Sequence, residues 1–295
     1  MHFCRVVALC GVAIQFTRER DRISFEPDHL METGRVAQAV ILAFSLFSIG
    51  CGSSIDKAVE QTTEETHPID PAGILIIRNP LGSIRISGSD DSEIKLRASK
   101  KAWSASQLSG IAVKISGPTA SVSVETAFPP QKTWLFSSRS GAVDYTISVP
   151  RLVRIARLEI GNGDVLIENM RGNMQANLVN GALTARNCFG NAELSVANGR
   201  LDLSYEKWEE REFSVNARII SGNVRTFLPG NASFHLLAET VHGNITDHLL
   251  ETSQRNPRRA TRVNMSMGTG ISGEITIRST DGNIEIAPAK DAPGP

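Results

Sequence analysis

Five glycines follow one another at intervals of nine residues in the middle of this chain: Gly163, Gly172, Gly181, Gly190 and Gly199. The second and fourth residues after each glycine are apolar, which gives the pairs Val165/Ile167, Met174/Ala176, Leu183/Ala185, Ala192/Leu194 and Leu201/Leu203. The residue between the members of a pair is polar, except for Leu166. An alternation of two inside a period of nine predicts short strands with one buried face, joined at tight turns.

The same phase recurs on both sides of this block, at Gly73, Gly82, Gly222, Gly243, Gly273 and Gly282. Many of these glycines follow a turn-favouring residue, such as Asn162, Ser221 or Asp281. Asn-Gly and Asp-Gly pairs tolerate the positive φ of a tight turn. We therefore expect all eleven glycines to be structural turn residues of one β-repeat domain over residues 71–290.

Two all-β architectures fit this pattern. In a β-solenoid-like fold (a right-handed β-helix with about nine residues per strand-turn unit), successive strands stack in parallel. In an antiparallel β-meander, the same Asn-Gly pairs close two-residue hairpins. Ala176, Ala185 and Ala192 predict a narrow interior, which favours the solenoid, although periodicity alone leaves the meander open.

Composition excludes some classes of function. The chain has 295 residues, with Lys plus Arg 31 and Asp plus Glu 31, so the net charge is zero and no nucleic-acid partner is expected. The four cysteines, Cys4, Cys10, Cys51 and Cys188, lack the paired spacing of a zinc site or a disulfide framework. We expect no metal and no cofactor, and Cys188 reads as a lone structural thiol.

The N-terminal part reads as a targeting segment. Residues 36–50 are apolar, follow the basic Arg35 and end at Cys51, but are too few to span a bilayer comfortably. The tetrad at residues 48–51 resembles a bacterial lipobox, in which the cysteine is lipidated. The resemblance implies that Cys51 carries a lipid anchor. A secreted protein and an uncleaved anchor are the alternatives.

This interpretation sets the domain boundaries. Met31 lies 20 residues before Cys51, a natural signal length, so residues 1–30 are predicted to be a gene-model extension and residues 31–50 the signal peptide. Residues 51–70, polar and without periodicity, are expected to be the lipidated cysteine and a flexible tether. The predicted location is the cell envelope, on the outer membrane or the periplasmic face if there are two membranes.

Several stretches resemble a bacterial family of adhesin-like proteins of unknown function, built from β-strand repeats. The similarity lies in residues 143–150, the Asn162-Gly163-Asp164-Val165 type of repeat, residues 221–245 and residues 281–286. It covers about residues 72–287 and departs from the family pattern at the basic stretch 250–270. The resemblance implies a solenoid-like fold, a cell-envelope location and no established catalytic residues.

Few residues point to chemistry. The basic loop Arg255, Arg258, Arg259 and Arg262 is a candidate binding loop, because guanidinium groups make bidentate contacts with phosphates and anionic glycans. His235, His242 and His248 match no metal-ligand spacing. Acidic residues alternate with neutral ones, as on a solvated strand face, rather than forming the carboxylate pair of a glycoside hydrolase. These residues are Asp164, Glu168, Glu193 and Asp202.

The sequence therefore predicts a cell-envelope lipoprotein with a non-catalytic β-repeat domain that serves as an adhesin-like interaction or structural module. Its expected partners are the membrane, through the lipid anchor, and surface glycans or envelope proteins. The sequence carries no signal for an oligomeric state. A polysaccharide-acting β-helix enzyme and an envelope-stress or assembly accessory protein are the two alternatives. Phe128, Trp134 and Phe136 are expected to plug one end of the core.

Overall fold

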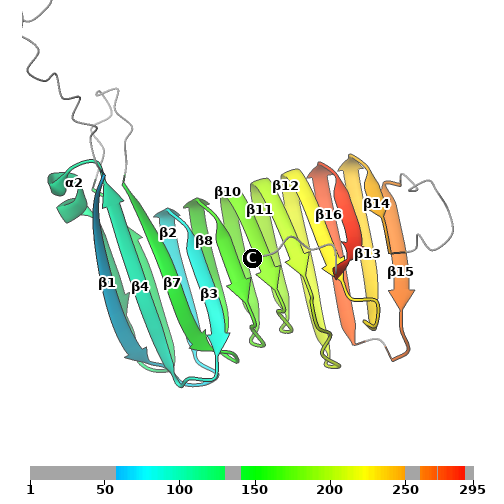
Figure 1. The fold of residues 1–295 in the computed structure, drawn as a ribbon, viewed down its shortest axis with the longest axis horizontal. Helices are drawn as coiled ribbons and strands as arrows, with labels where there is room; N and C mark the ends of the chain where they lie inside the picture. Colours follow the sequence, from blue (N-terminus) through cyan, green and yellow to red (C-terminus); the bar gives the residue numbers. More distant parts are fainter. Residues whose placement is uncertain (1–57, 130–140, 250–259, 271, 290–295) are drawn as a thin grey trace, which may run out of the picture. The chain divides into compact units, whose positions relative to one another are not determined.

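The computed structural model describes residues 58–129, 141–249, 260–270 and 272–289, and these residues form two sheets packed face to face with one short helix (Figure 1). Three long strands, β10, β11 and β12, bend midway and so belong to both sheets. The part of each before the bend is called its first arm, and the part after it its second arm. Apolar side chains of both sheets form one continuous core.

The first sheet contains, in spatial order, β5 (Ala112–Ser116), β6 (Ser121–Ala127), β2 (Ile74–Leu81), β8 (Arg154–Asn162), the first arms of β10 (Met174–Arg186), β11 (Ala192–Ser204) and β12 (Phe213–Leu228), then β16 (Gly273–Asp281), β13 (Phe234–His242) and β15 (Arg262–Met267).

The second sheet contains, in spatial order, β1 (Val59–Pro68), β4 (Glu93–Ala102), β7 (Ala142–Pro150), β3 (Ile84–Ser89), β9 (Val165–Glu168), the second arms of β10, β11 and β12, then β17 (Ile284–Pro288) and β14 (Ile245–Asp247).

The repeating unit is a coil of two strand segments. Met174 pairs in parallel with Ala192, and Leu183 with Leu201, each eighteen positions further along the chain. One coil therefore contains two of the nine-residue units that the sequence predicts. Parallel stacking confirms the solenoid-like fold and excludes the meander for this block, because hairpins would pair neighbouring segments antiparallel.

Antiparallel strands close both ends of the stack. At one end β1 pairs with β4, β4 with β7, and β5 with β6, and at the other end β13 pairs with β15. Near this second end the chain order is interrupted, because β16 and β17 lie between β12 and the β13–β14 segment. The strands β16 and β17 thus lie inside the stack and not at its end, although they follow β13, β14 and β15 in the sequence.

The core contains the apolar pairs that the sequence predicts to be buried. Every member of the five apolar pairs around the central glycines is buried, with exposed fractions of 5% or less. The alternation of buried and exposed positions along β10 and β11 is the physical signature of a strand with one face on the core. Loss of the buried apolar pair from one coil would remove the side chains on which the two neighbouring coils pack.

The glycines occupy two kinds of corner. Gly181 and Gly199 have φ of 138° and 136°, and a Cβ on Gly199 would collide with the Gly181 carbonyl of the preceding coil. At the opposite corner Gly190 needs no positive φ, but a Cβ there would collide with the Gly172 carbonyl. Both corners therefore require glycine, one for its backbone conformation and close contact, the other for close contact alone.

At Asn180-Gly181 and Asn198-Gly199 the chain bends inside continuous strands. β10 and β11 keep their pairing on both sides of the bend, with Asn180 opposite Asn198 and Gly181 opposite Gly199. The side chains also form a ladder, since Asn198 Nδ2 donates to Asn180 Oδ1 at 3.1 Å. The sequence predicts turns between separate strands at these positions. The structure instead shows β10 and β11 crossing from one sheet to the other, whereas at Asn162-Gly163 the strands β8 and β9 are separate, as predicted.

Part of the predicted tether belongs to a sheet. Val59–Pro68 forms β1, which pairs along its whole length with β4. Glu60 lies opposite Lys101, and Glu64 opposite Arg97, so opposite charges face each other on the two strands. The strand has no buried apolar face, and hydrophobic periodicity therefore could not reveal it.

An aromatic cluster fills the corner near residues 206–212, which break the repeat. The Trp208 ring lies 5.4 Å from that of Phe213 and 5.9 Å from that of Phe234, and its Nε1 donates to Ser272 Oγ at 3.3 Å. Of the predicted plug residues, Phe128 packs on the core, and Trp134 and Phe136 lie outside the described residues. The charged segment 206–212 thus contains an aromatic residue, Trp208, that packs against the core.

The helix α2 (Ala105–Gly110) is capped by Ser104, whose Oγ accepts from the Gln107 amide at 3.2 Å. It contacts β1 and β4 and covers the end of the second sheet. No helix within the described ranges has the length and the apolar character needed to cross a bilayer.

Candidate functional site

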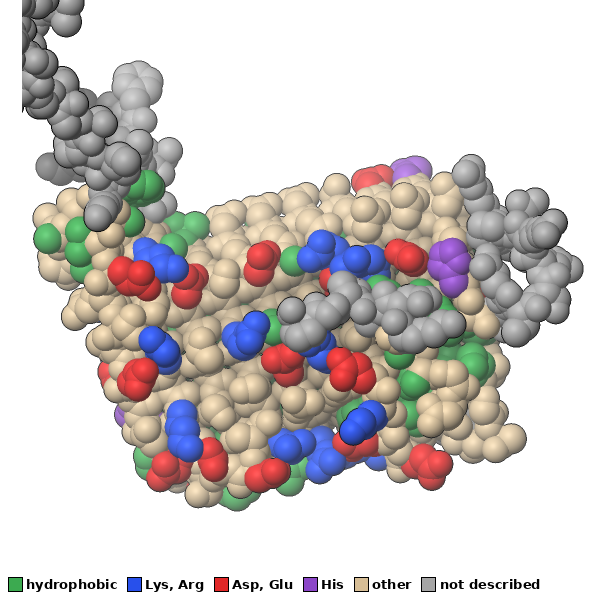
Figure 2. All heavy atoms as spheres, viewed as in Figure 1, with side chains coloured by type: hydrophobic (Ala, Val, Ile, Leu, Met, Phe, Trp, Pro, Cys, Tyr) green, Lys and Arg blue, Asp and Glu red, His purple; other side chains and the backbone are tan. Residues whose placement is uncertain are grey.

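Polar side chains line up across the outer face of the second sheet. The third residue after each bend lies beside its counterpart on the next strand, and the register gives the series Thr184, Asp202, Arg225, Glu285 and Thr246. We call these five residues the polar row. On the face drawn in Figure 2, basic and acidic side chains are interspersed across the strands. Opposite charges on adjacent strands stabilise such an arrangement.

Asp202 is the most enclosed member of the polar row, with only 8% of its side chain exposed. Arg225 donates to both of its carboxylate oxygens, at 2.9 Å and 2.8 Å, and Arg200 Nε donates at 2.9 Å. The bond to Asp202 raises the pKa of Arg225 above its ordinary value. The sequence predicts Asp202 on a solvated face, but its two arginines shield it from water.

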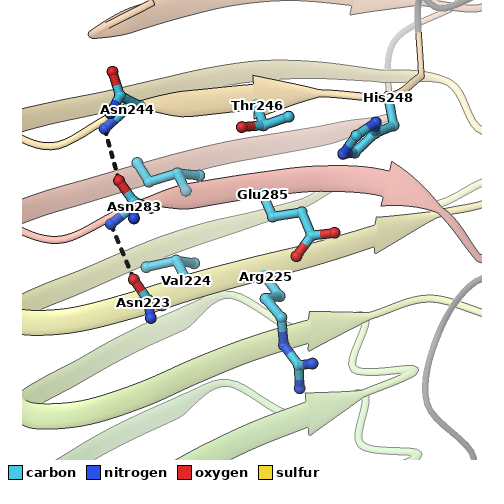
Figure 3. Close-up of a pocket in the computed structure, with 9 residues that line it drawn as sticks. Asn223, Val224, Arg225, Asn244, Thr246, His248, Asn283 and Glu285 are labelled. Carbon is cyan, nitrogen blue, oxygen red and sulfur yellow. Dashed lines mark hydrogen bonds between the residues drawn. The ribbon is translucent and has the colours of Figure 1, made fainter. Parts of the chain in front are cut away.

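An asparagine ladder borders the row. The backbone N–H of Asn283 donates to Asn223 Oδ1 at 3.1 Å, and the backbone N–H of Asn244 donates to Asn283 Oδ1 at 3.0 Å (Figure 3). Each side-chain oxygen thereby satisfies a backbone donor of the next strand. The Nδ2 groups keep two donors each for other acceptors.

A hollow of about 450 Å³ lies over these strands, lined by the three asparagines together with Arg225, Thr246, His248 and Glu285. Figure 3 shows Glu285 extending from β17 toward β12, with Thr246 and His248 on the far side of β17. Amides, a hydroxyl, a carboxylate and a guanidinium occur here at the spacing of neighbouring strands, about 4.8 Å. Such a surface can donate to and accept from an extended polar ligand.

A second hollow of about 640 Å³ lies further along the same sheet, over β7, β3, β9 and β10. Asp144 on its wall accepts from the Ser83 amide and from Lys101 Nζ, both at 2.8 Å. The bond with Asp144 raises the pKa of Lys101. The two hollows make the second sheet a broad polar surface at both ends of the polar row.

The structure describes only part of the predicted basic loop. Arg262 lies on the edge strand β15, with its Nε 3.3 Å from Glu239 Oε1. Arg255, Arg258 and Arg259 lie outside the described residues, as does Cys51. The lipid anchor and the binding loop therefore remain predictions.

The predicted histidines do not meet. His235 bonds Asn264 Oδ1 at 2.8 Å, and His242 bonds Asp281 Oδ1 at 2.8 Å. His242 stands where other coils place Asn or Ser, so its bond extends the corner ladder. Across the part of the chain that the structure describes, no three metal-binding side chains gather.

The acidic residues weighed for hydrolysis are dispersed and engaged. Glu193 faces outward from the first sheet, whereas Glu168 and Asp202 lie on the second, bonded to Arg186 and Arg225. Asp164 accepts from the Ala182 amide at 2.9 Å. Glu168, Asp202 and Asp164 each have a structural partner in the stack.

Cys188 is buried, with an exposed fraction of 2%. Burial raises the pKa of its thiol from 9.0 to about 12. The thiol is therefore protonated at neutral pH, and protonated thiols are poor nucleophiles.

The sequence analysis does not identify Arg225, Glu285 and the asparagine ladder as one set. The asparagines directly follow Gly222, Gly243 and Gly282, and Arg225 and Glu285 are the third residues after Gly222 and Gly282, so their common offsets are a signal in the sequence. The signal was incomplete because β17 lies between β12 and β14, which local periodicity does not encode. Arg225 and Glu285 become neighbours only through this insertion.

The match to a protein family agrees with this fold. Residues 136–287 match the family described as Toastrack DUF4097. No curated protein matches the chain.

Solved structures give distant matches, each covering 77% of this chain. A cell-adhesion candidate from Clostridium sporogenes is 14% identical, is covered over 99% of its length and has a TM-score of 0.40. A lipid-binding candidate from Parabacteroides distasonis is 11% identical, is covered over 96% and scores 0.33. An adhesin candidate from Bacteroides fragilis is 11% identical, is covered over 97% and scores 0.30.

Proposed function

The chain belongs to the Toastrack DUF4097 family, and from this premise we propose that it is a non-catalytic interaction module of the bacterial cell envelope. Its polar row binds an extended, hydrogen-bonding polymer, and a lipid on Cys51 holds it at a membrane. The names of the solved relatives, which include adhesion candidates, agree with this role. The partners are surface glycans or envelope proteins.

One observation carries the proposal: the in-register array of polar side chains over β12, β17 and β14 borders an open hollow of about 450 Å³. Parallel strand pairing holds the backbone of these residues in register, so little backbone conformational entropy is lost on binding. The array is wide and shallow, which suits a polymer lying across several strands better than an enclosed small molecule.

The test is binding of purified surface polysaccharides and peptidoglycan fragments to the full chain. We expect Glu285→Ala to weaken binding of the recognised polymer about tenfold, because a carboxylate in the hollow is lost. Glu274→Ala is the matched control, since Glu274 is exposed on β16 of the other sheet. Equal binding by both variants and the unaltered protein would contradict a role for the polar row.

A further inference from the structure

A third hollow, also lined by charged residues, lies on the first sheet, at the end where β12, β16, β13 and β15 are neighbours. Its volume is about 390 Å³, and its walls include Arg218, Arg278, Arg262 and Glu239. The register places Arg218 beside Arg278, Arg278 beside Glu239, and Glu239 beside Arg262. Four strands therefore present three guanidinium groups and one carboxylate in a single row.

The charges in this row do not balance. Glu239 serves two arginines, with Oε2 3.6 Å from Arg278 Nε and Oε1 3.3 Å from Arg262 Nε. Within the described ranges no carboxylate lies in ion-pair distance of Arg218, whose other cross-strand neighbour is the uncharged Ser195. The hollow thus holds a net positive charge of two.

Arg218 and Arg278 stand directly opposite each other on adjacent parallel strands. Like charges in such positions are unfavourable unless an anion lies between them. A guanidinium is planar and offers paired donors that match the two oxygens of a carboxylate, sulfate or phosphate group. The guanidinium groups of Arg218 and Arg278, which line the same hollow, can therefore receive an oxyanion, and Arg262 offers a second position across Glu239.

The surroundings indicate what carries the oxyanion. The hollow is open, and its rim includes the hydroxyls of Thr261 and Thr280 and the exposed side chain of Val241. Hydroxyl groups and a small aliphatic surface suit a sugar ring, and the row of four strands is about 14 Å long, long enough for an extended ligand.

We propose that the Arg218–Arg278 hollow binds the carboxylate or sulfate groups of an acidic polysaccharide. This inference rests on the proposed function, because it assigns a ligand class and a second surface to the same interaction module. It concerns residues that the predicted basic loop does not include, apart from Arg262.

The experiment measures binding of the full chain to oligogalacturonate and to heparin-derived oligosaccharides, with uncharged dextran, inorganic phosphate and phosphatidylglycerol vesicles in parallel. We expect Arg218→Gln and Arg278→Gln each to weaken binding of an acidic oligosaccharide about tenfold or more. Arg154→Gln on β8 removes the same charge from the same sheet and should leave binding unchanged. Unaltered thermal unfolding of each variant shows that the fold is intact.

Arg218→Lys sharpens the test, because it keeps the charge and loses the paired donors, so it should also weaken binding. Equal weakening by Arg154→Gln, binding of phosphate or vesicles without the oligosaccharides, or unchanged binding by the arginine variants would each overturn the inference. Oligosaccharide binding that depends on Glu285 but not on Arg218 would leave the proposed function standing. Oligosaccharide binding that depends on Arg218 and Arg278 but not on Glu285 would support the inference and contradict the role of the polar row.

Discussion

The corner glycines are the residues on which the stacking depends. Gly181, Gly199 and Gly222 lie one above another, and a Cβ on each of the last two would meet the carbonyl of the glycine before it. Backbone therefore packs on backbone at this corner, and the ladder of Asn162, Asn180 and Asn198 binds the coils together beside it.

Replacement of Gly199 by alanine should destabilise the domain strongly. The positive φ of 136° strains any residue with a Cβ, which costs about 1–3 kcal/mol, and the added contact must also displace the Gly181 carbonyl. We expect a loss of about 3 kcal/mol or more in the free energy of unfolding, measured in urea. Gly230→Ala is the control, because a Cβ there meets nothing within 4 Å. Equal stability of the two variants would contradict the close stacking.

Cys188 supplies a prediction on pH. Its folded pKa is raised from 9.0 to about 12, so above about pH 9 the unfolded thiol loses its proton before the folded one does. The free energy of unfolding should therefore fall between about pH 9 and pH 12, and be fully retained below that range. Tyr205, whose pKa burial also raises, contributes in the same direction. The free energy of unfolding is measured against pH for the unaltered protein and for Cys188→Ala, and the difference between the two slopes above pH 9 gives the contribution of the thiol. An identical slope in Cys188→Ala would show that Cys188 is not buried as described.

At the scale of elements, the apolar pairs could be predicted and the interruptions could not. A period of nine identifies the buried pairs in β10 and β11 because every strand must place alternate residues on the core. Residues 206–212 are charged except for Trp208, yet Trp208 belongs to an aromatic cluster with Phe189, Tyr205, Phe213 and Phe234. A single aromatic residue within charged sequence gives no periodic signal.

Trp208→Ala should therefore cost about 2–4 kcal/mol, because the ring packs on several others but is partly exposed. Thermal unfolding should show a lower midpoint, by about 5–10 °C. Trp103→Ala, at a position 43% exposed, is the control and should change the midpoint less. A larger effect at Trp103 would contradict the structural role of the cluster.

At the scale of the whole domain, the order of the coils is the property that the sequence could not supply. Val224, Ile245 and Ile284 stand at the same offset from their glycines, so local pattern gives β12, β14 and β17 no distinct places. The structure inserts β16 and β17 between β12 and the β13–β14 segment. For this reason the candidate site over these strands could not be assembled from the chain alone.

A chain ending at Gly270 tests this order, since it lacks β16 and β17. We expect the β13 amides that bond to β16 to lose protection in hydrogen exchange, while those that bond to β15, and the amides of β10 and β11, stay protected. A chain ending at Lys290 retains both strands and should behave as the full chain does. Full protection in the shorter chain of the β13 amides that bond to β16 in the full chain would contradict the insertion.

The most direct test of the interaction module at the envelope is intact mass combined with membrane fractionation of the expressed protein and of Cys51→Ser. The account predicts a chain that begins at a diacylated Cys51 and sediments with membranes, and release of the Cys51→Ser variant into the soluble fraction. An unmodified chain that stays soluble in both forms would contradict the anchor and the envelope location.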